Sequence, residues 1–382
     1  MEFLTNITSF GGSAFGYIIP FVFVLSIVVF FHELGHFLVG RWCGVKVLVF
    51  SIGFGPELFA FHDRQGTRWR IAAVPLGGYV KFFGDANAAS MPDADKAQLM
   101  SEEERKVSFF HKAIWQRSLI VAAGPIANFI LAIVIFAGIF SIVGKQVVAP
   151  RIDTVNAGSA AERAGLQPGD VILSIDGAAI TSFSAMQRVV SASPGRELSI
   201  EVMRDGETVK LAATPEMKEQ SDGFGGTMRI GLLGVTRSTN PSDVSFQRAD
   251  PLTAIGMGVS ETTYIVTRTF DFIGGLFAGR EHANQIGGPI RIAQMSEHVA
   301  ESGGLIGLVS LAAVLSVSIG LLNLFPIPLL DGGHLVFYAI EAIRGRPLAE
   351  RAQELLFKAG LAAVLMLMVF ATWNDLVHVL GG

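Results

Sequence analysis

The stretch YIIPFVFVLSIVVFFHELGHFLV, residues 17–39, decides how this chain folds. It is apolar and long enough to cross a bilayer as one helix, which needs about 20 residues. Within it, HELGH places His32, Glu33 and His36 in the pattern H-E-x-x-H. Histidines four positions apart share one face of a helix, so both imidazoles can bind one metal ion. Ionisable side chains inside an apolar helix cost several kcal/mol unless they are paired or coordinated.

This spacing predicts a Zn²⁺ site that activates water. Zinc lowers the pKa of a water ligand to about 7, which makes a nucleophile available at neutral pH. Glu33 would act as the general base, accepting the proton of the water and passing it to the leaving amine. The alternative is a helix end at the membrane surface just before Arg41, but that alternative does not explain the spacing.

The composition indicates a membrane protein. Of 382 residues, 51% are hydrophobic and 16% are charged, whereas soluble domains carry about 25% charged residues. The mean hydropathy is +0.49. A net charge of -4 gives no sign of nucleic-acid binding, and Cys43, the one cysteine, excludes an internal disulfide. Residues 1–31 contain no Lys or Arg, so we expect no cleavable signal peptide.

The apolar runs predict about four transmembrane helices, and the basic residues predict their orientation. Asp375 and His378 near its end make the last run the least typical. Lys and Arg are concentrated in residues 41–117 and 344–351, which we expect to be cytoplasmic. Both termini and residues 144–304 would then be extracytoplasmic. The predicted spans are residues 17–39, 119–143, 305–330 and 359–380.

Two segments between these spans are typical of β-structure. Residues 45–61 and 68–82 are β-prone, and we expect a membrane-associated hairpin or small sheet packed against the spans, because open sheet edges at membrane depth must be covered by protein. The alternative is a soluble cytoplasmic hairpin. Residues 147–215 alternate short apolar runs with Asp-Gly turns, which predicts a compact α+β domain. In that region we expect strands at 171–175, 198–202 and 208–211, helices at 160–164 and 184–190, and a closing strand at 228–235.

These patterns divide the chain into four predicted parts. Residues 251–279 are amphipathic and interrupted by charges, so we expect an interfacial helix there. The predicted parts are residues 1–146 (membrane part with the metal helix and β region), 147–236 (α+β domain), 237–304 (linker and interfacial helices) and 305–382 (C-terminal membrane part).

A third metal ligand is expected from NLFPIPLLDGGH, residues 323–334. Pro326 and Pro328 would break the third span, and unwound backbone at membrane depth is tolerated only where it is buried or lines a cavity. Such a segment can bring Asp331 to the metal and offer backbone groups to a substrate strand. The alternative is an ordinary turn, since Pro and Asp-Gly are common turn residues. His334 is a rival ligand.

Together, HELGH and NLFPIPLLDGGH resemble the motifs of the site-2 protease family, and more closely those of its bacterial regulator of sigma-E protease branch. GPIANF, residues 124–129, and a PDZ-like insert extend the resemblance over nearly the whole chain. It implies that His32, His36 and Asp331 bind zinc and that Glu33 is the catalytic base. Asn323 would hold the substrate or its oxyanion, although it could equally be a helix-end amide that caps backbone groups.

The resemblance also implies one extracytoplasmic PDZ-like domain, where better-known members have two. Residues 165–170 (GLQPGD) with 171–176 look like a PDZ core, and residues 231–235 (GLLGV) look like a carboxylate-binding edge. PDZ domains bind extended peptides by strand addition and capture a C-terminal carboxylate. The domain could instead exclude substrates with large outer domains, or be a plain structural module.

The sequence therefore predicts an intramembrane zinc endopeptidase of the bacterial inner membrane that performs regulated intramembrane proteolysis. The substrates implied are single-span proteins already cut on the extracytoplasmic side, such as anti-sigma factors or signal-peptide remnants. One alternative is a membrane-bound PDZ adaptor without catalysis, against which the intact Glu33 argues. Another is a zinc transporter or sensor, because intramembrane His and Asp also mark ion paths.

Overall fold

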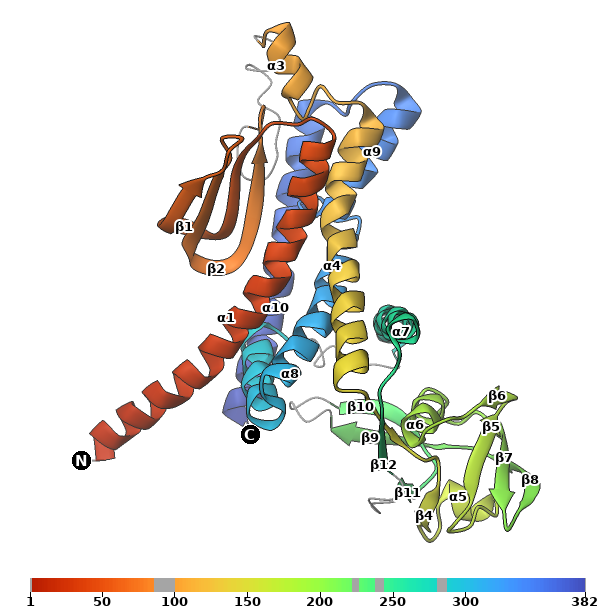
Figure 1. Cartoon of the computed structure of the whole chain (residues 1–382). Coiled ribbons are helices and arrows are strands. Elements are labelled where there is room, and N and C mark those ends of the chain that lie inside the picture. Colours follow the sequence, from red (N-terminus) through yellow and green to blue (C-terminus); the bar gives the residue numbers. More distant parts are fainter. Residues whose placement is uncertain (1, 86–99, 222–226, 238–243, 280–286, 382) are drawn as a thin grey trace. The chain divides into compact units, whose positions relative to one another are not determined.

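The chain divides into two compact units in a computed structural model (Figure 1). The structure describes residues 2–85, 100–221, 227–237, 244–279 and 287–381. The helical unit comprises Met1–Ala137, Ile255–Thr269 and Gly287–Asp375, and the strand unit comprises Gly138–Ala254, Phe270–Ile286 and Leu376–Gly382.

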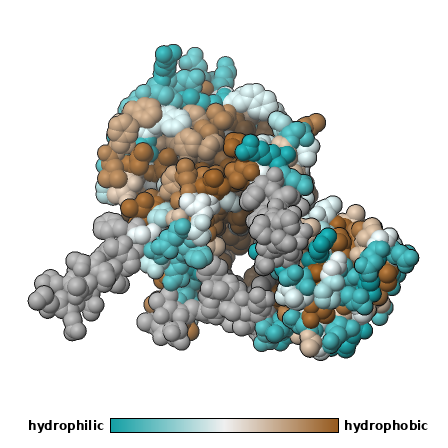
Figure 2. All heavy atoms as spheres, turned by 60° about the horizontal axis from the view of Figure 1, so that its bottom comes forward, coloured by the Kyte–Doolittle hydropathy of each residue, from teal (hydrophilic) through white to brown (hydrophobic). Residues whose placement is uncertain are grey.

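Four helices in the described residues are long and apolar enough to cross a membrane, as predicted. The segments that meet this criterion are Gly16–Trp42, Ile114–Ile142, Pro289–Asn323 and Arg351–Val377. Figure 2 shows apolar residues gathered over the helical unit and hydrophilic residues over much of the strand unit. The helices are α1 (Glu2–Trp42), α4 (Ile114–Ile142), α8 (Pro289–Asn323) and α10 (Glu350–Gly381).

The predicted third span, residues 305–330, starts directly after a kink within α8 and is wrong at its end. Helix α8 begins at Pro289 and ends at Asn323, with non-helical backbone at Gly304 (φ 56°, ψ -146°). Pro326 and Pro328 cannot continue a helix, so the chain leaves α8 before them. A further helix, α9 (Asp331–Arg344), then begins at Asp331.

Asp375, a charged residue near the end of the apolar helix α10, forms hydrogen bonds through its carboxylate. It accepts hydrogen bonds from the backbone N–H groups of Gly288 (2.9 Å), Ile290 (3.1 Å) and Arg291 (3.1 Å). These groups belong to the N-terminus of α8, where Gly288 offers no side-chain cap. Asp375 therefore caps α8 from another helix.

The predicted β-hairpin is present in the helical unit. Strand β1 (Val47–His62) pairs antiparallel with β2 (Arg68–Phe82), and residues 49–52, near the start of β1, have pairing partners in both ends of β2. The sheet packs on α1 through a core that contains Phe37, Phe50 and Phe82. The short helix α3 (Glu102–Val107) follows the sheet.

The strand unit has the predicted α+β composition. Its largest sheet has the order β6-β5-β7-β8, and its tight turns place Asp176 (φ 49°) and Asp205 (φ 50°) just before glycines. The buried core includes Ile172, Leu198 and Ile200. The elements are β5 (Val171–Ile175), β6 (Ala178–Ala179), β7 (Leu198–Arg204), β8 (Glu207–Ala213), α5 (Ala160–Arg163) and α6 (Phe183–Ser191).

The predicted closing strand, residues 228–235, is interrupted, because the chain forms two separate strands there. Thr227–Leu232 (β10) pairs with β9, whereas Val235–Arg237 (β11) pairs with β4. Gly234 between them has a φ of 80°, which interrupts extended backbone. Residues 251–279 form the expected helix, α7 (Pro251–Phe277). The other strands are β3 (Lys145–Val148), β4 (Ile152–Val155), β9 (Glu216–Ser221) and β12 (Val244–Gln247), which pairs with β3.

Candidate metal centre

Helix α1 presents the two histidines together, as their spacing predicts. The ring centroids of His32 and His36 are 4.9 Å apart, and their Nε2 atoms are 3.3 Å apart. Two ring nitrogens at this separation are well placed to share one cation.

Residues of helix α4 contact the Nδ1 atoms of both rings and so orient them. The Nδ1 atom of His36 lies 2.9 Å from the carbonyl oxygen of Ile120, which can only accept, so Nδ1 carries the proton and Nε2 is free to bind a metal. The Nδ1 atom of His32 lies 3.2 Å from the Asn128 side-chain amide. Sequence reasoning quoted Asn128 within GPIANF but gave it no role. The available signal was an amide inside an otherwise apolar span.

Glycines let α1 and α4 approach closely at this point. A Cβ on Gly35 would lie 2.2 Å from the carbonyl oxygen of Ala123, and a Cβ on Gly124 would lie 2.2 Å from His36 Nε2. Both distances are far below van der Waals contact. The backbone of α4 therefore forms one wall of the histidine pair, and only glycine fits at either position.

The third donor comes from the start of α9. Asp331 Oδ2 lies 3.3 Å from His32 Nε2 and 3.5 Å from His36 Nε2. The donor atoms of the three residues all lie within 4.8 Å of one another. Residues distant in sequence thus meet at one point, as the motif pair predicts.

Glycines also allow the Asp331 segment to fold into place. A Cβ on Gly332 would lie 2.3 Å from the carbonyl oxygen of Leu324, and one on Gly333 would lie 2.4 Å from that of Ile327. Leu329 has a φ of 106°, a strained value for a residue other than glycine. The DGG sequence is therefore needed to pack the first turn of α9 against the unwound segment that follows α8.

The donor set fits zinc. Asp331 Oδ2 is buried and, among the described residues, has no hydrogen-bond partner, although an unpaired buried carboxylate oxygen is costly. Two imidazoles and one carboxylate, with a fourth position open, are typical of catalytic zinc sites. The rival ligand His334 lies in the same cavity wall, but its nitrogens are outside the three-residue donor group. Burial lowers the pKa of His334 and favours a neutral ring.

The donors line a cavity of about 230 Å³. Glu33 lies in its wall and is only 8% exposed. Strand β2 forms another wall, since a Cβ on Gly78 would lie 2.9 Å from Cγ of Glu33. Asn323, the last residue of α8, also lines the cavity. The cavity therefore brings together a buried glutamate, three side chains that could hold a metal ion, a strand and an amide.

A buried ion pair ties α4 to α9. Arg117 Nη2 donates to Glu341 Oε1 over 2.7 Å, and the guanidinium lies 4.9 Å from the ring centroid of Tyr338. Burial also raises the pKa of Tyr338, so its hydroxyl stays protonated. The helix that begins at Asp331 is thereby fixed to the helix that orients the histidines.

Comparison with known proteins identifies the family. A family model described as peptidase family M50 matches residues 20–367. The chain is 50% identical over 378 residues to a protein of Agrobacterium fabrum that is named as a zinc metalloprotease, covering 99% of this chain and 100% of that protein. It is 51% identical over 361 residues to a protein of Rhizobium meliloti with a name of the same kind, covering 94% and 96%. It is also 42% identical over 380 residues to metalloprotease MmpA of Caulobacter vibrioides, covering 94% and 95%.

The family match covers two of the helices that are apolar enough to cross a membrane completely and most of the other two, and it includes the histidine pair and Asp331. The family match and the four apolar helices together indicate a multi-pass membrane protein. The chain belongs to peptidase family M50, the site-2 protease family, and is a zinc metalloprotease.

Proposed function

We propose that this protein is an endopeptidase that cuts peptide bonds within the membrane, with His32, His36 and Asp331 as zinc ligands and Glu33 as the catalytic base. The observation that carries the proposal is the convergence of three donor atoms within 4.8 Å of one another, two of them on a helix apolar enough to span a bilayer. Glu33 lines the same cavity.

The residues of this chain divide the work of hydrolysis between them. Zinc, when bound, supplies Lewis acidity that makes water more acidic and polarises a carbonyl. Glu33 takes a proton from the attacking water and delivers it to the nitrogen of the leaving amine. Its burial excludes bulk water and strengthens electrostatic interactions in the cavity. Asn128 and the Ile120 carbonyl hold the two imidazoles in orientation.

A substrate helix must unwind before attack, because its carbonyls are hydrogen-bonded within the helix. We propose that the unwound segment adds as a strand along β2, where Gly78, Tyr79 and Val80 line the cavity. Asn323 would hold the scissile carbonyl oxygen or the adjacent backbone. Its place in the cavity wall supports this role.

We propose single-span proteins already trimmed on the extracytoplasmic side as substrates, of the anti-sigma factor or signal-peptide-remnant type. Cutting them would be regulated intramembrane proteolysis in the bacterial inner membrane. The distribution of Lys and Arg supports extracytoplasmic termini. The exposed apolar residues of β1, such as Leu58 (70%) and Phe59 (59%), support contact between the hairpin and lipid.

The strand unit is proposed as a PDZ-like domain that meets the extracytoplasmic part of a substrate. Its helices and four-stranded sheet support this proposal. It could capture the new C-terminus left by an earlier cut, or it could exclude substrates with large outer domains. Deleting residues 147–236 separates the two roles: loss of capture reduces cleavage of trimmed substrates, whereas loss of a filter extends cleavage to untrimmed ones.

Glu33→Gln tests the proposed function. We expect cleavage of a fluorescence-quenched transmembrane peptide in micelles to fall by about 100-fold or more, with one zinc per chain retained by metal analysis. Glu207→Gln makes the same change on an exposed strand of the strand unit and should leave cleavage unchanged. Full activity of Glu33→Gln, or zinc flux into sealed vesicles without peptide cleavage, would contradict the proposal.

A further inference from the structure

One face of α1 contacts the β1–β2 sheet along a stripe with four-residue spacing. A Cβ on Gly78 would lie 2.9 Å from both Glu33 Cγ and Val29 Cγ1. One turn further on, the ring of Phe37 packs edge-on against Phe50 and Trp69, with centroids 5.5 Å and 5.0 Å apart. Residues four apart share a helix face, and the next position on this stripe is Arg41.

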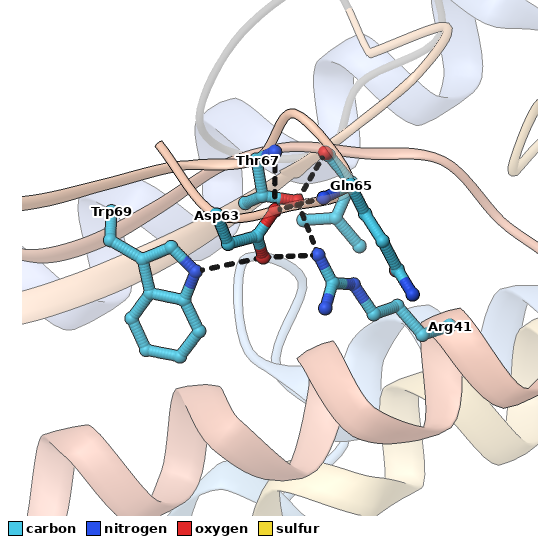
Figure 3. Close-up of polar contacts among 6 residues, drawn as sticks. Arg41, Asp63, Gln65, Thr67 and Trp69 are labelled. Carbon is cyan, nitrogen blue, oxygen red and sulfur yellow. Dashed lines mark hydrogen bonds and ion pairs between the residues drawn. The ribbon is translucent and has the colours of Figure 1, made fainter. Parts of the chain in front are cut away.

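Arg41 closes the stripe with a polar contact to the loop between β1 and β2 (Figure 3). Its Nη2 atom donates to Asp63 Oδ2 and, over 2.9 Å, to the hydroxyl of Thr67. That hydroxyl in turn donates to the carbonyl oxygen of Val47 over 2.8 Å. The guanidinium also lies 4.2 Å from the ring centroid of Phe37. One side chain at the end of α1 is thus joined to the loop, the start of β1 and the aromatic contact.

Asp63 is the centre of this group, and both oxygens of its carboxylate accept hydrogen bonds. Oδ2 also accepts from Trp69 Nε1 over 3.1 Å, and Oδ1 accepts from the backbone N–H groups of Gln65 (2.9 Å) and Thr67 (3.0 Å). Burial would raise the pKa of Asp63, but these donors and Arg41 together hold it below its usual range. Asp63 is therefore ionised at neutral pH, with its geometry fixed from four directions (Figure 3).

The two ends of the stripe have different roles. Glu33 and Arg41 are separated by eight positions, or about 12 Å along a helix that rises 1.5 Å per residue. At one end the sheet touches the proposed catalytic base through Gly78, which has no side chain to adjust the contact. At the other end it is held by charged groups that are three-quarters buried or more. Arg41 therefore adds a polar restraint on rotation of the sheet about Gly78 to the aromatic packing around Phe37.

We propose that Arg41 and Asp63 are positioning residues that hold the β1–β2 sheet in register with the Glu33 face of α1 and so place the substrate strand for cleavage. The inference rests on the proposed function of the cavity, because it assigns the pair a role in that reaction. Neither residue lines the cavity, so the pair acts through the sheet.

The test compares Arg41→Gln and Asp63→Asn with Arg68→Gln in the full-length protein. Arg68 pairs with Glu57 within the same sheet and is 47% exposed, so Arg68→Gln removes an ion pair without touching α1. Arg41→Gln and Asp63→Asn should loosen the contact between the sheet and α1 only partly. In both variants we therefore expect KM for the quenched transmembrane peptide to rise about tenfold, with kcat within about twofold and zinc content unchanged.

Hydrogen exchange supplies a readout that needs no cleavage. Backbone amides of residues 78–82 should exchange faster in Arg41→Gln and Asp63→Asn but not in Arg68→Gln. Faster exchange with unchanged KM would overturn the inference, because the pair would then be structural only. Equal KM and exchange in all three variants would overturn it as well. If the unmodified protein fails to cleave or Glu33→Gln stays active, the proposed function fails, and the exchange data separately decide whether the pair anchors the sheet.

Discussion

Two buried carboxylates, one in each unit, have opposite surroundings. In the strand unit, Asp170 is 1% exposed, and both of its oxygens accept from Arg204, at 2.8 and 2.7 Å, with a further bond from the Gln167 N–H at 2.8 Å. In the helical unit, Asp331 Oδ2 has no hydrogen-bond partner among the described residues and faces two imidazole nitrogens. Protein groups alone satisfy the carboxylate of Asp170, whereas the carboxylate of Asp331 needs a bound cation.

This difference separates a structural carboxylate from a ligand. Removing a carboxylate from water costs several kcal/mol, and a bidentate guanidinium with a backbone N–H offsets that cost. Asp331 has no such partner, so folding alone does not account for its position. Unsatisfied acceptors that converge with imidazoles therefore indicate a metal site, whereas burial alone does not.

The largest effect is expected from a substitution of Asp331, whose Oδ2 has no hydrogen-bond partner among the described residues. Asp331→Asn should remove stoichiometric zinc and lower cleavage by at least about 100-fold, because a neutral amide is a poor zinc ligand. Asp170→Asn is the matched control: it should destabilise the strand unit and leave zinc bound. Metal analysis of both purified proteins makes the comparison. Retention of zinc by Asp331→Asn would show that the two carboxylates do not differ in this way.

A smaller effect is expected from a substitution of Asn128, which contacts His32 but is not itself one of the proposed metal ligands. Asn128→Ala removes the side chain next to His32 Nδ1 and should weaken zinc binding by about 10- to 100-fold. Competition with a chelator of known affinity measures this change. Asn156→Ala, at an exposed position of the strand unit, should leave the affinity unchanged. Equal affinities in both variants would mean that α4 does not orient His32.

The smallest effect is expected from lowering the pH until Asp170, the carboxylate that is paired with Arg204, becomes protonated. Burial would raise the pKa of Asp170, but Arg204 and the Gln167 N–H hold it below its usual value. The ionised pair therefore stabilises the strand unit fully above the unfolded Asp pKa of about 3.9, and this contribution is lost as the pH falls through the lower folded value. The protection factors of β7 and β8 amides, which are corrected for the intrinsic pH dependence of exchange, should not change from pH 7 to pH 5 and should fall below pH 4. In Arg204→Gln this acid-dependent step should be reduced.

Local sequence patterns predicted much of the fold and most of the site. Hydropathy identified the four helices, the i, i+4 spacing placed His32 and His36 on one face, and Asp-Gly pairs marked turns of the strand unit. These features depend on neighbours along the chain, so a single sequence contains them. The convergence of Asp331 with the histidines was expected from the paired motifs, and the structure brings the three residues together.

Other features depend on contacts between distant segments, and local patterns do not contain them. Residues 289–304 were assigned to a linker with interfacial helices because Glu297 and Glu301 interrupt their hydropathy, and their continuity with the apolar span was missed. Its N-terminus is capped by Asp375, which is far away in sequence. Asn128 and the Arg41–Asp63 contact were missed for the same reason, since no periodicity in the sequence relates them to their partners.

The contact of α1 and α4 at glycines has a consequence for inhibitor resistance. On that side the zinc site is walled by backbone, and any added carbon at Gly124 would lie 2.2 Å from the imidazole of His36. A compound that binds against this wall would meet a surface that the protein cannot reshape by substitution without displacing its own ligand. Escape mutations should instead arise across the cavity, along the strand that carries Tyr79 and Val80.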